Sequence, residues 1–168
     1  LSSAQELGIP IHLHLHETQD EVQSALDETG IRPIERLHKL GLINNLLQAV
    51  HMTQLTQSEI SLLAKNGVQI AHCPDSNLKL ASGFCPVSEL RDANINVSVG
   101  TDSVASNNNL DMLAELRSAA LLAKGISGKA TTITAGEALE MGTINGAKFL
   151  GLDDKIGSLE IGKQADLI

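Results

Sequence analysis

Residues 9–19 read IPIHLHLHETQ, a short stretch in which histidine alternates with an aliphatic residue. His12, His14 and His16 are three of only six histidines in the chain. Strict alternation has the period of a β-strand, so the pattern predicts a strand with the imidazoles on one face and the aliphatic side chains on the other. Imidazole is suited to metal ligation and to proton transfer near neutral pH. A polar strand face without a chemical role is the alternative for this stretch taken alone.

Similar apolar runs recur later in the chain, and helical patterns such as residues 56–67 (TQSEISLLAKNG) separate them. Short strands that alternate with helices predict an α/β fold with a parallel sheet and right-handed crossovers. The four predicted strands end at His16, His51, His72 and Asp102. Active sites of parallel α/β folds gather at the carboxyl ends of the strands. Four polar side chains at these positions therefore predict a functional site.

The helical patterns carry recognisable start and stop signals. One helix should end at Gly30, and the next should begin near Pro33. Thr56 or Ser58 is the expected N-cap of a further helix, and residues 108–127 form the longest helical pattern. Two shorter helices, TAGEALEMG and TINGAKFLG, should follow it.

Composition excludes several classes of function. Twelve basic and twenty acidic residues give a net charge of −8, and the chain has no tyrosine or tryptophan. Without a basic patch, nucleic-acid binding is not expected. No apolar run approaches the roughly 18 residues that a membrane span needs. No secretory signal is visible either, so a cytoplasmic protein with reduced cysteines at Cys73 and Cys85 is expected.

The polar residues at the strand ends include the usual ligands of a hydrolytic metal site. Two imidazoles and a carboxylate can hold zinc and leave a position open for water. Taken singly, His51 and His72 would more often be packed or capping histidines than ligands, and Asp102 could be a turn or capping residue. Ser76 and Asn77 lie in the expected loop after His72, where they could orient a small polar substrate.

Four segments in this order, HLHLHET, HMTQLT, HCPDSNLKLASG and GTDSVASNNNLDML, resemble the amidohydrolase superfamily. Within it they resemble the branch of methylthioadenosine and S-adenosylhomocysteine deaminases, whose neighbours are guanine deaminases and triazine chlorohydrolases. The resemblance covers essentially all 168 residues. SNLKLASG and GTDSVASNN are its most specific segments.

The resemblance implies roles for individual residues. His51 would be a metal ligand from the sixth strand of a barrel, and Asp102 a ligand from the eighth strand that also moves a proton. His14 would contact substrate, and His72 would lie by the leaving group or the attacked carbon. Ser106 would lie near the sugar or thioether end of a nucleoside.

The resemblance also exposes a departure from the family pattern. Many members carry a glutamate three residues after the position of His51, whereas this chain has Gln54 there. An amide cannot exchange a proton at neutral pH, so Gln54 is expected to orient substrate while His72 and Asp102 carry the proton transfers. His12 and His16 match no ligand position.

A second departure concerns length, since a complete (β/α)₈ barrel needs roughly 250 residues and no first-strand H-x-H pair is present. Residues 1–154 are expected to be the second half of such a TIM-type barrel, with strands five to eight. Residues 155–168 are expected to begin a small β-sandwich. A half-barrel exposes strand edges, so we expect a homo-oligomer or a need for the missing N-terminal half.

The sequence thus predicts part of a metal-dependent hydrolytic deaminase of an adenine nucleoside, such as methylthioadenosine or S-adenosylhomocysteine. One divalent metal is expected, zinc first and iron as the alternative. The competing hypotheses are a guanine- or triazine-type hydrolase of the same superfamily and a non-catalytic half-barrel that binds a ligand.

Overall fold

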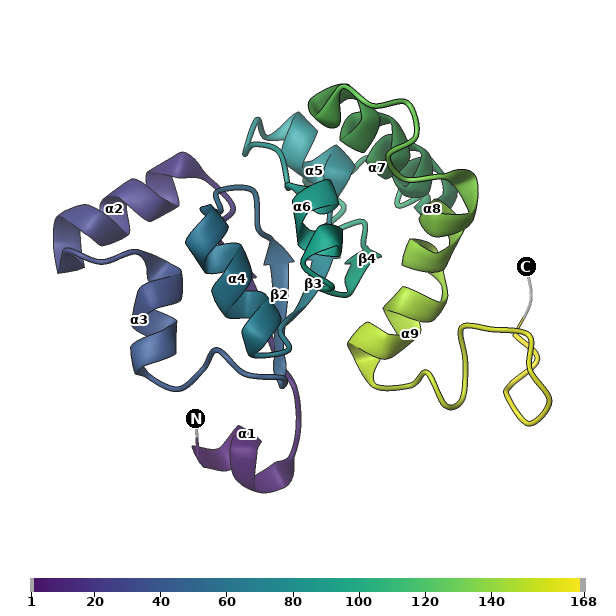
Figure 1. The fold of residues 1–168 in the computed structure, drawn as a ribbon, viewed down its shortest axis with the longest axis horizontal. Helices are drawn as coiled ribbons and strands as arrows, with labels where there is room; N and C mark the ends of the chain where they lie inside the picture. Colours follow the sequence, from purple (N-terminus) through teal and green to yellow (C-terminus); the bar gives the residue numbers. More distant parts are fainter. Residues whose placement is uncertain (1, 167–168) are drawn as a thin grey trace.

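A computed structural model describes residues 2–166 of the chain and shows a four-stranded parallel sheet (Figure 1). The strands are β1 (Ile11–Leu15), β2 (Leu47–His51), β3 (Gln69–His72) and β4 (Val97–Val99). They lie side by side in sequence order, and each neighbouring pair is parallel. The predicted α/β fold with a parallel sheet is confirmed.

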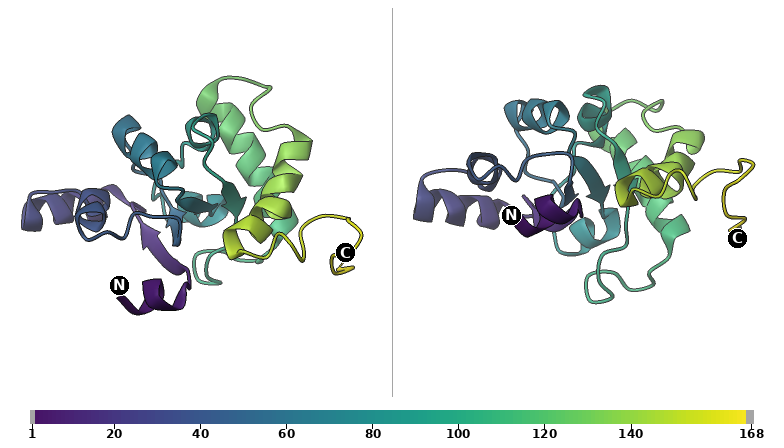
Figure 2. Two further views of the ribbon diagram at one scale, coloured as in Figure 1. Left: turned by 60° about the horizontal axis from the view of Figure 1, so that its bottom comes forward. Right: turned by 90° about the horizontal axis from the view of Figure 1, so that it is seen from below.

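One helix precedes the first strand, and helices follow every strand. They are α1 (Ser2–Leu7), α2 (Gln19–Thr29), α3 (Pro33–Lys39), α4 (Gln57–Lys65), α5 (Pro74–Lys79), α6 (Val87–Asp92), α7 (Met112–Ser127), α8 (Ala135–Gly142) and α9 (Ile144–Leu150). Figure 1 shows α4 and α6 in front of the sheet, and α7, α8 and α9 pack beside β4. The turned views in Figure 2 show α1 and the segment after α9 extending away from the sheet.

The helix start and stop signals predicted from the sequence are found at helix ends in the structure. Gly30 caps α2 with a left-handed φ of 73°, and Pro33 opens α3. Thr56, rather than Ser58, is the N-cap of α4, because its hydroxyl accepts from the amide of Glu59 in a capping box. The long helix begins later than residue 108, since the Asp111 carboxylate caps α7.

Two helices lie where none was expected. The segment after His72 was expected to be a loop, yet α5 forms there with Pro74 in its first turn, a position that proline favours. The first helix, α1, precedes β1. Neither is long enough to show a clear helical period, which is why the sequence pattern missed them.

The core is aliphatic, as the scarcity of aromatic residues predicts. Its largest fully buried apolar side chains include Ile34, Leu47, Leu63, Ile70, Leu90 and Met141. Of the two phenylalanines, Phe149 is buried and Phe84 is half exposed. Among the described residues, no helix is long and apolar enough to cross a membrane.

Residues 155–166 form turns and contain no strand. The assignment of residues 155–168 to a β-sandwich and the boundary after residue 154 stay predictions, and residues 167–168 lie outside the described residues.

Candidate metal centre

The polar residues singled out in the sequence meet at the carboxyl edge of the sheet. β2 ends at His51 and β3 ends at His72, as predicted. β1 ends at Leu15, one residue before His16, and β4 ends three residues before Asp102. Because parallel strands share the same direction, side chains that end or follow them converge at one edge.

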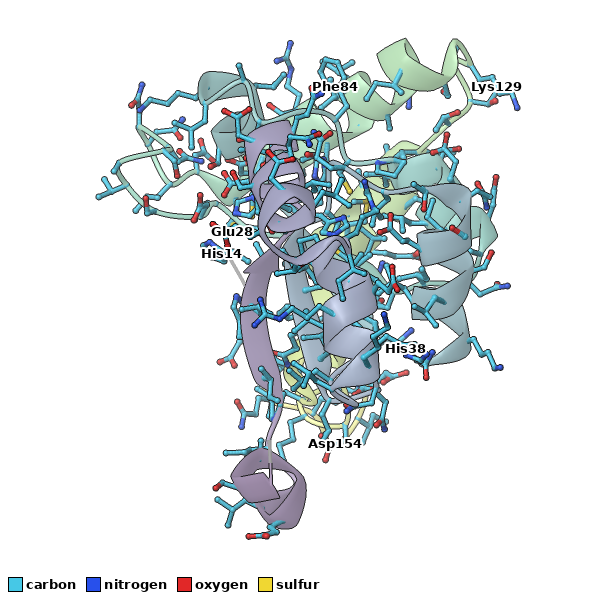
Figure 3. All side chains as sticks on the ribbon, turned by 90° about the vertical axis from the view of Figure 1, so that its left-hand side faces the viewer. His14, Glu28, His38, Phe84, Lys129 and Asp154 are labelled. Atoms are coloured by element: carbon cyan, nitrogen blue, oxygen red, sulfur yellow. The ribbon has the colours of Figure 1, made fainter. Side chains whose placement is uncertain are left out.

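Three of these side chains form a compact group. His14, His51 and Asp102 each offer a ligand atom, and the three atoms all lie within 4.8 Å of one another. The rings of His14 and His51 are perpendicular, with centroids 4.7 Å apart. In Figure 3, His14 projects from β1 on the side opposite α3, which carries His38. His14, expected to contact substrate, thus lies in the same group as the expected ligands His51 and Asp102.

His51 is held in one orientation by its neighbours. Its ring is fully buried, and its Nδ1 lies 2.8 Å from Oδ1 of Asn77. Since a carbonyl oxygen can only accept, this contact favours the tautomer that carries its proton on Nδ1 and leaves Nε2 as the acceptor. Among the described residues, Nε2 of His51 has no hydrogen-bond partner. A buried acceptor in this state is ready to bind a metal or a substrate donor.

Asp102 is held as a carboxylate. Its Oδ2 accepts hydrogen bonds from Ser76 Oγ at 2.6 Å and Ser106 Oγ at 2.7 Å. Burial disfavours the charged form, but these hydrogen bonds outweigh it and hold the pKa of Asp102 below its ordinary value. The structure therefore brings Ser106 against Asp102.

His72 lies at the end of β3 but outside the three-residue group. It is 1% exposed, and burial, reinforced by the nearby His51, lowers its pKa to about 3. His72 is therefore neutral at physiological pH, and its Nδ1 has no partner among the described residues. A neutral imidazole can hold an uncharged ligand, but it is a poor proton donor.

Gln54 does not join the group. Its amide donates to Thr53 Oγ1 and to the carbonyl of Ser82, both at 2.9 Å. The carboxylate beside the group is instead Glu17, which sequence reasoning missed. Its Oε2 lies 3.7 Å from Nε2 of His51, and its Oε1 accepts from Ser82 Oγ.

A sequence signal for Glu17 existed. Glu17 follows His14 by three residues at the end of the opening strand, the same spacing that drew attention to Gln54 after His51. The alternating histidines are the stronger pattern in this stretch, and Glu17 lies outside that alternation.

The expectation that three imidazoles share one face of β1 is wrong for His16. His12 and His14 are exposed, whereas His16 is fully buried and has a left-handed φ of 51°. This turn carries its ring to the other side of the strand, where Ile34 N donates to Nε2 and the carbonyl of Gln54 lies 3.0 Å from Nδ1.

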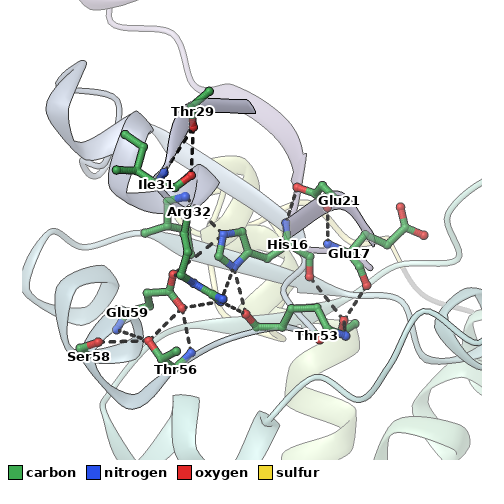
Figure 4. A network of polar contacts seen from close by, with 12 residues as sticks. His16, Glu17, Glu21, Thr29, Ile31, Arg32, Thr53, Thr56, Ser58 and Glu59 are labelled. Carbon is green, nitrogen blue, oxygen red and sulfur yellow. Dashed lines mark hydrogen bonds and ion pairs between the residues drawn. The ribbon is translucent and has the colours of Figure 1, made fainter. Parts of the chain in front are cut away.

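Figure 4 shows His16 in a closed network with the ion pair of Arg32 and Glu59. Arg32 Nε lies 2.7 Å from Glu59 Oε1, and its Nη2 also donates to the carbonyl of Gln54. The network joins the end of β1 to α3 and α4. His16 is thus a packing residue, and both His12 and His16 lie outside the group of ligand atoms.

Comparisons with known proteins agree with this arrangement. Residues 1–168 match the Amidohydrolase family. A protein of Teredinibacter turnerae, named 5-methylthioadenosine/S-adenosylhomocysteine deaminase, is 53% identical over 98% of this chain and 37% of its own length. A 5'-deoxyadenosine deaminase of Methanobrevibacter smithii is 46% identical over 98% of this chain and 38% of its own length. The chain therefore spans well under half the length of these relatives.

Solved structures show the same fold. An adenosine deaminase from Xanthomonas campestris with bound zinc has a TM-score of 0.96 and 53% identity, over 98% of this chain and 38% of its own. A triazine hydrolase variant has a TM-score of 0.91 and 32% identity, over 98% and 36%. The parallel sheet and its helices are thus part of the barrel fold of these enzymes, as predicted. With a match along its whole length and a His/Asp group of ligand atoms at the carboxyl edge of its sheet, the chain belongs to the amidohydrolase family.

Proposed function

We propose that the protein is a metal-dependent hydrolytic deaminase of adenine nucleosides of the methylthioadenosine type. The observation that carries the proposal is the convergence of His14, His51 and Asp102 within 4.8 Å, with the Glu17 carboxylate beside them. The names of the relatives from Teredinibacter and Methanobrevibacter support the choice of substrate class.

The residues present fit a divalent metal. Two neutral imidazoles and a carboxylate are a common zinc ligand set, and Nε2 of His51 is buried with no other partner among the described residues. Zinc is proposed ahead of iron because the similar Xanthomonas structure contains zinc. When bound, the metal would act as a Lewis acid and make water at the site more acidic.

The chain's own carboxylates have the geometry for proton transfer. Asp102 is ionised and can accept a proton from the attacking water. Glu17 supplies a second carboxylate, 3.7 Å from His51 Nε2, which can take up a proton that originates from the water and pass it to the departing amino group, so that ammonia leaves. In this proposal water adds to the amino-bearing carbon of the purine, the C–N bond breaks, and ammonia leaves.

The remaining candidates have supporting roles. His72, neutral with a pKa of about 3, would contact the uncharged purine ring. Ser106 would hold Asp102 through its hydrogen bond. Gln54, whose amide is bound to Ser82, would shape the loop after β2.

The test is ammonia release from methylthioadenosine, S-adenosylhomocysteine and 5'-deoxyadenosine by the zinc-loaded protein. Glu17→Gln should lower kcat by about 100-fold or more, the usual effect of removing a general acid or base. His38→Ala, a change of an exposed histidine on α3, should leave the rate unchanged. Unchanged activity in Glu17→Gln would contradict the role of Glu17.

Two other functions are outcomes of the same assay. Ammonia release from guanine, or turnover of a triazine with none from the nucleosides, would favour the guanine- or triazine-type alternative. That alternative has weaker support, since the triazine hydrolase and E. coli guanine deaminase structures are 32% and 30% identical. Nucleoside binding without turnover would favour a non-catalytic binding module.

A further inference from the structure

Glu115 is a buried acid that the proposed chemistry does not use. It lies on α7 with 0% of its surface exposed, outside the group of ligand atoms. One carboxylate oxygen, Oε2, accepts from the backbone amide of Asp75 at 3.3 Å, and the other, Oε1, accepts from the side-chain amide of Asn107. A buried carboxylate is retained only where such partners satisfy it.

The two partners of Glu115 are the chain neighbours of the two serines that hold Asp102. Asp75 directly precedes Ser76, and Asn107 directly follows Ser106. Ser76 and Ser106 both donate to the same oxygen of Asp102. The carboxylate of Glu115 therefore fixes the backbone of one serine segment and a side chain of the other.

The segment that contains Ser76 also fixes His51, the other expected metal ligand. Asn77 lies one residue beyond Ser76 in α5, is 1% exposed, and hydrogen-bonds to Nδ1 of His51. This contact decides which nitrogen of His51 keeps its lone pair. A shift of α5 away from α7 would thus disturb both His51 and Asp102.

A second set of hydrogen bonds, at the surface, joins α5 to the segment that contains Ser106. Lys79, near the end of α5, donates to the carbonyl of Ala105 and to Oδ1 of Asn108. These contacts are exposed to water and are individually weak. Glu115 itself is fully buried, and loss of its carboxylate leaves the amide of Asp75 and the side chain of Asn107 without this acceptor.

We propose that Glu115 is a positioning residue for the metal centre, acting as a clamp between α5 and residues 103–107. It touches no ligand atom and works through Ser76, Asn77 and Ser106. This inference rests on the metal centre of the proposed function, and it does not depend on which substrate the protein uses.

The test compares three variants of the purified protein. Glu115→Ala removes both acceptors, and Glu115→Gln keeps the size but replaces one acceptor with a donor. Leu116→Ala is the control for lost stability, since Leu116 is the adjacent residue of α7 and lies in the main core cluster. All measurements are made at a temperature at which circular dichroism shows every variant to be folded.

The first readout is zinc affinity, measured by competition with a chromophoric chelator. Removing groups that orient metal ligands costs 10- to 100-fold in affinity, and for a residue one step further out we expect about tenfold weakening in Glu115→Ala. Glu115→Gln should give a smaller loss, and Leu116→Ala should bind zinc as the wild type does. Equal losses in Glu115→Ala and Leu116→Ala, or no loss in Glu115→Ala, would overturn the proposal.

The second readout, amide hydrogen exchange, needs no metal. Glu115→Ala should exchange faster at residues 74–80 and 103–110 while the strands keep their protection. Unchanged exchange in both segments would also overturn the proposal. A wild-type protein that binds zinc but releases no ammonia from any nucleoside would count against the proposed function alone.

Discussion

At the scale of single residues, the candidate metal centre depends on side chains that orient the expected ligands through hydrogen bonds. Two serine hydroxyls share one oxygen of Asp102, and Asn77 selects the free nitrogen of His51. Three residues at or after strand ends, His16, His51 and Asp102, have positive φ values of 51°, 73° and 59°. Such a conformation costs of order 1 kcal/mol or more for a residue with a side chain and clusters at functional sites.

The shared oxygen of Asp102 makes a prediction about the serines. Ser76→Ala and Ser106→Ala should each weaken zinc binding by about tenfold, because each removes a hydrogen bond that orients a ligand. The measurement is the same chelator competition. Ser61→Ala, a change of an exposed serine on α4 away from the centre, is the control. Equal zinc affinity in all three variants would contradict this role of the hydroxyls.

The pH dependence of stability provides a second prediction at this scale. Burial, with the nearby charges of Asp75 and Asp102, raises the pKa of Glu115 to about 7, against hydrogen bonds that lower it. Between about pH 4.5 and 7 the unfolded chain has lost this proton while the folded chain retains it. The contribution of Glu115 to the free energy of unfolding therefore falls as the pH rises through this range and stays low above it.

The comparison that isolates this contribution is between the wild type and Glu115→Gln. From pH 5 to pH 8 the melting temperature of the wild type should drop relative to that of the variant, which cannot ionise there. Parallel curves for the two proteins would show that Glu115 does not titrate in this range. Effects of the buried histidines cancel because both proteins contain them.

At the scale of elements, capping residues set where the helices begin. Both α4 and α8 start with a threonine and a glutamate three residues later in a complete capping box. Two of the short strands end at a polar residue with left-handed backbone, His51 at the end of β2 and His16 directly after β1. Element order and most boundaries were therefore readable from local sequence, whereas α5 was not, because its six residues are too few to show a period.

A substitution at the N-cap of α8 tests how much a capping residue contributes to stability. Thr134→Ala should lower stability by about 1 kcal/mol, the usual cost of losing an N-cap hydroxyl. For a protein of this size that corresponds to roughly 2–4 °C in melting temperature. Thr131→Ala, an exposed threonine just before α8, should change it little. Zinc affinity should be the same in both variants, since the α8 cap contacts none of the ligands.

At the scale of the whole molecule, the sheet brings distant segments together. His14 and Asp102 are 88 residues apart in sequence, from their numbers 14 and 102, yet their ligand atoms lie within 4.8 Å. Among the described residues, β1 and β4 each pair with a strand on one side only. The expected homo-oligomer stays a prediction, to be checked by light scattering.

A metal that bridges such distant segments should stabilise the fold as a whole. At zinc concentrations 100 times the dissociation constant, binding to the folded state adds about 2.7 kcal/mol. The melting temperature should then rise by roughly 5–10 °C and fall back when a chelator is added. His51→Ala should abolish the shift, while His38→Ala should retain it. A zinc-induced shift that persists in His51→Ala would place the metal elsewhere.

The amino-acid sequence by itself determined the order of strands and helices, the parallel sheet, the aliphatic core and the family, because these follow from local periodicity, composition and segment order. It also pointed to His51 and Asp102, since polar residues directly after apolar strands are visible along the chain. Only the tertiary structure decided that His14 joins them, that His16 turns into the interior, and that the carboxylate of Glu17, and not the side chain of Gln54, lies beside the group. Those choices depend on the backbone turn at each strand end and on contacts between segments far apart in sequence, and neither is encoded in a local pattern.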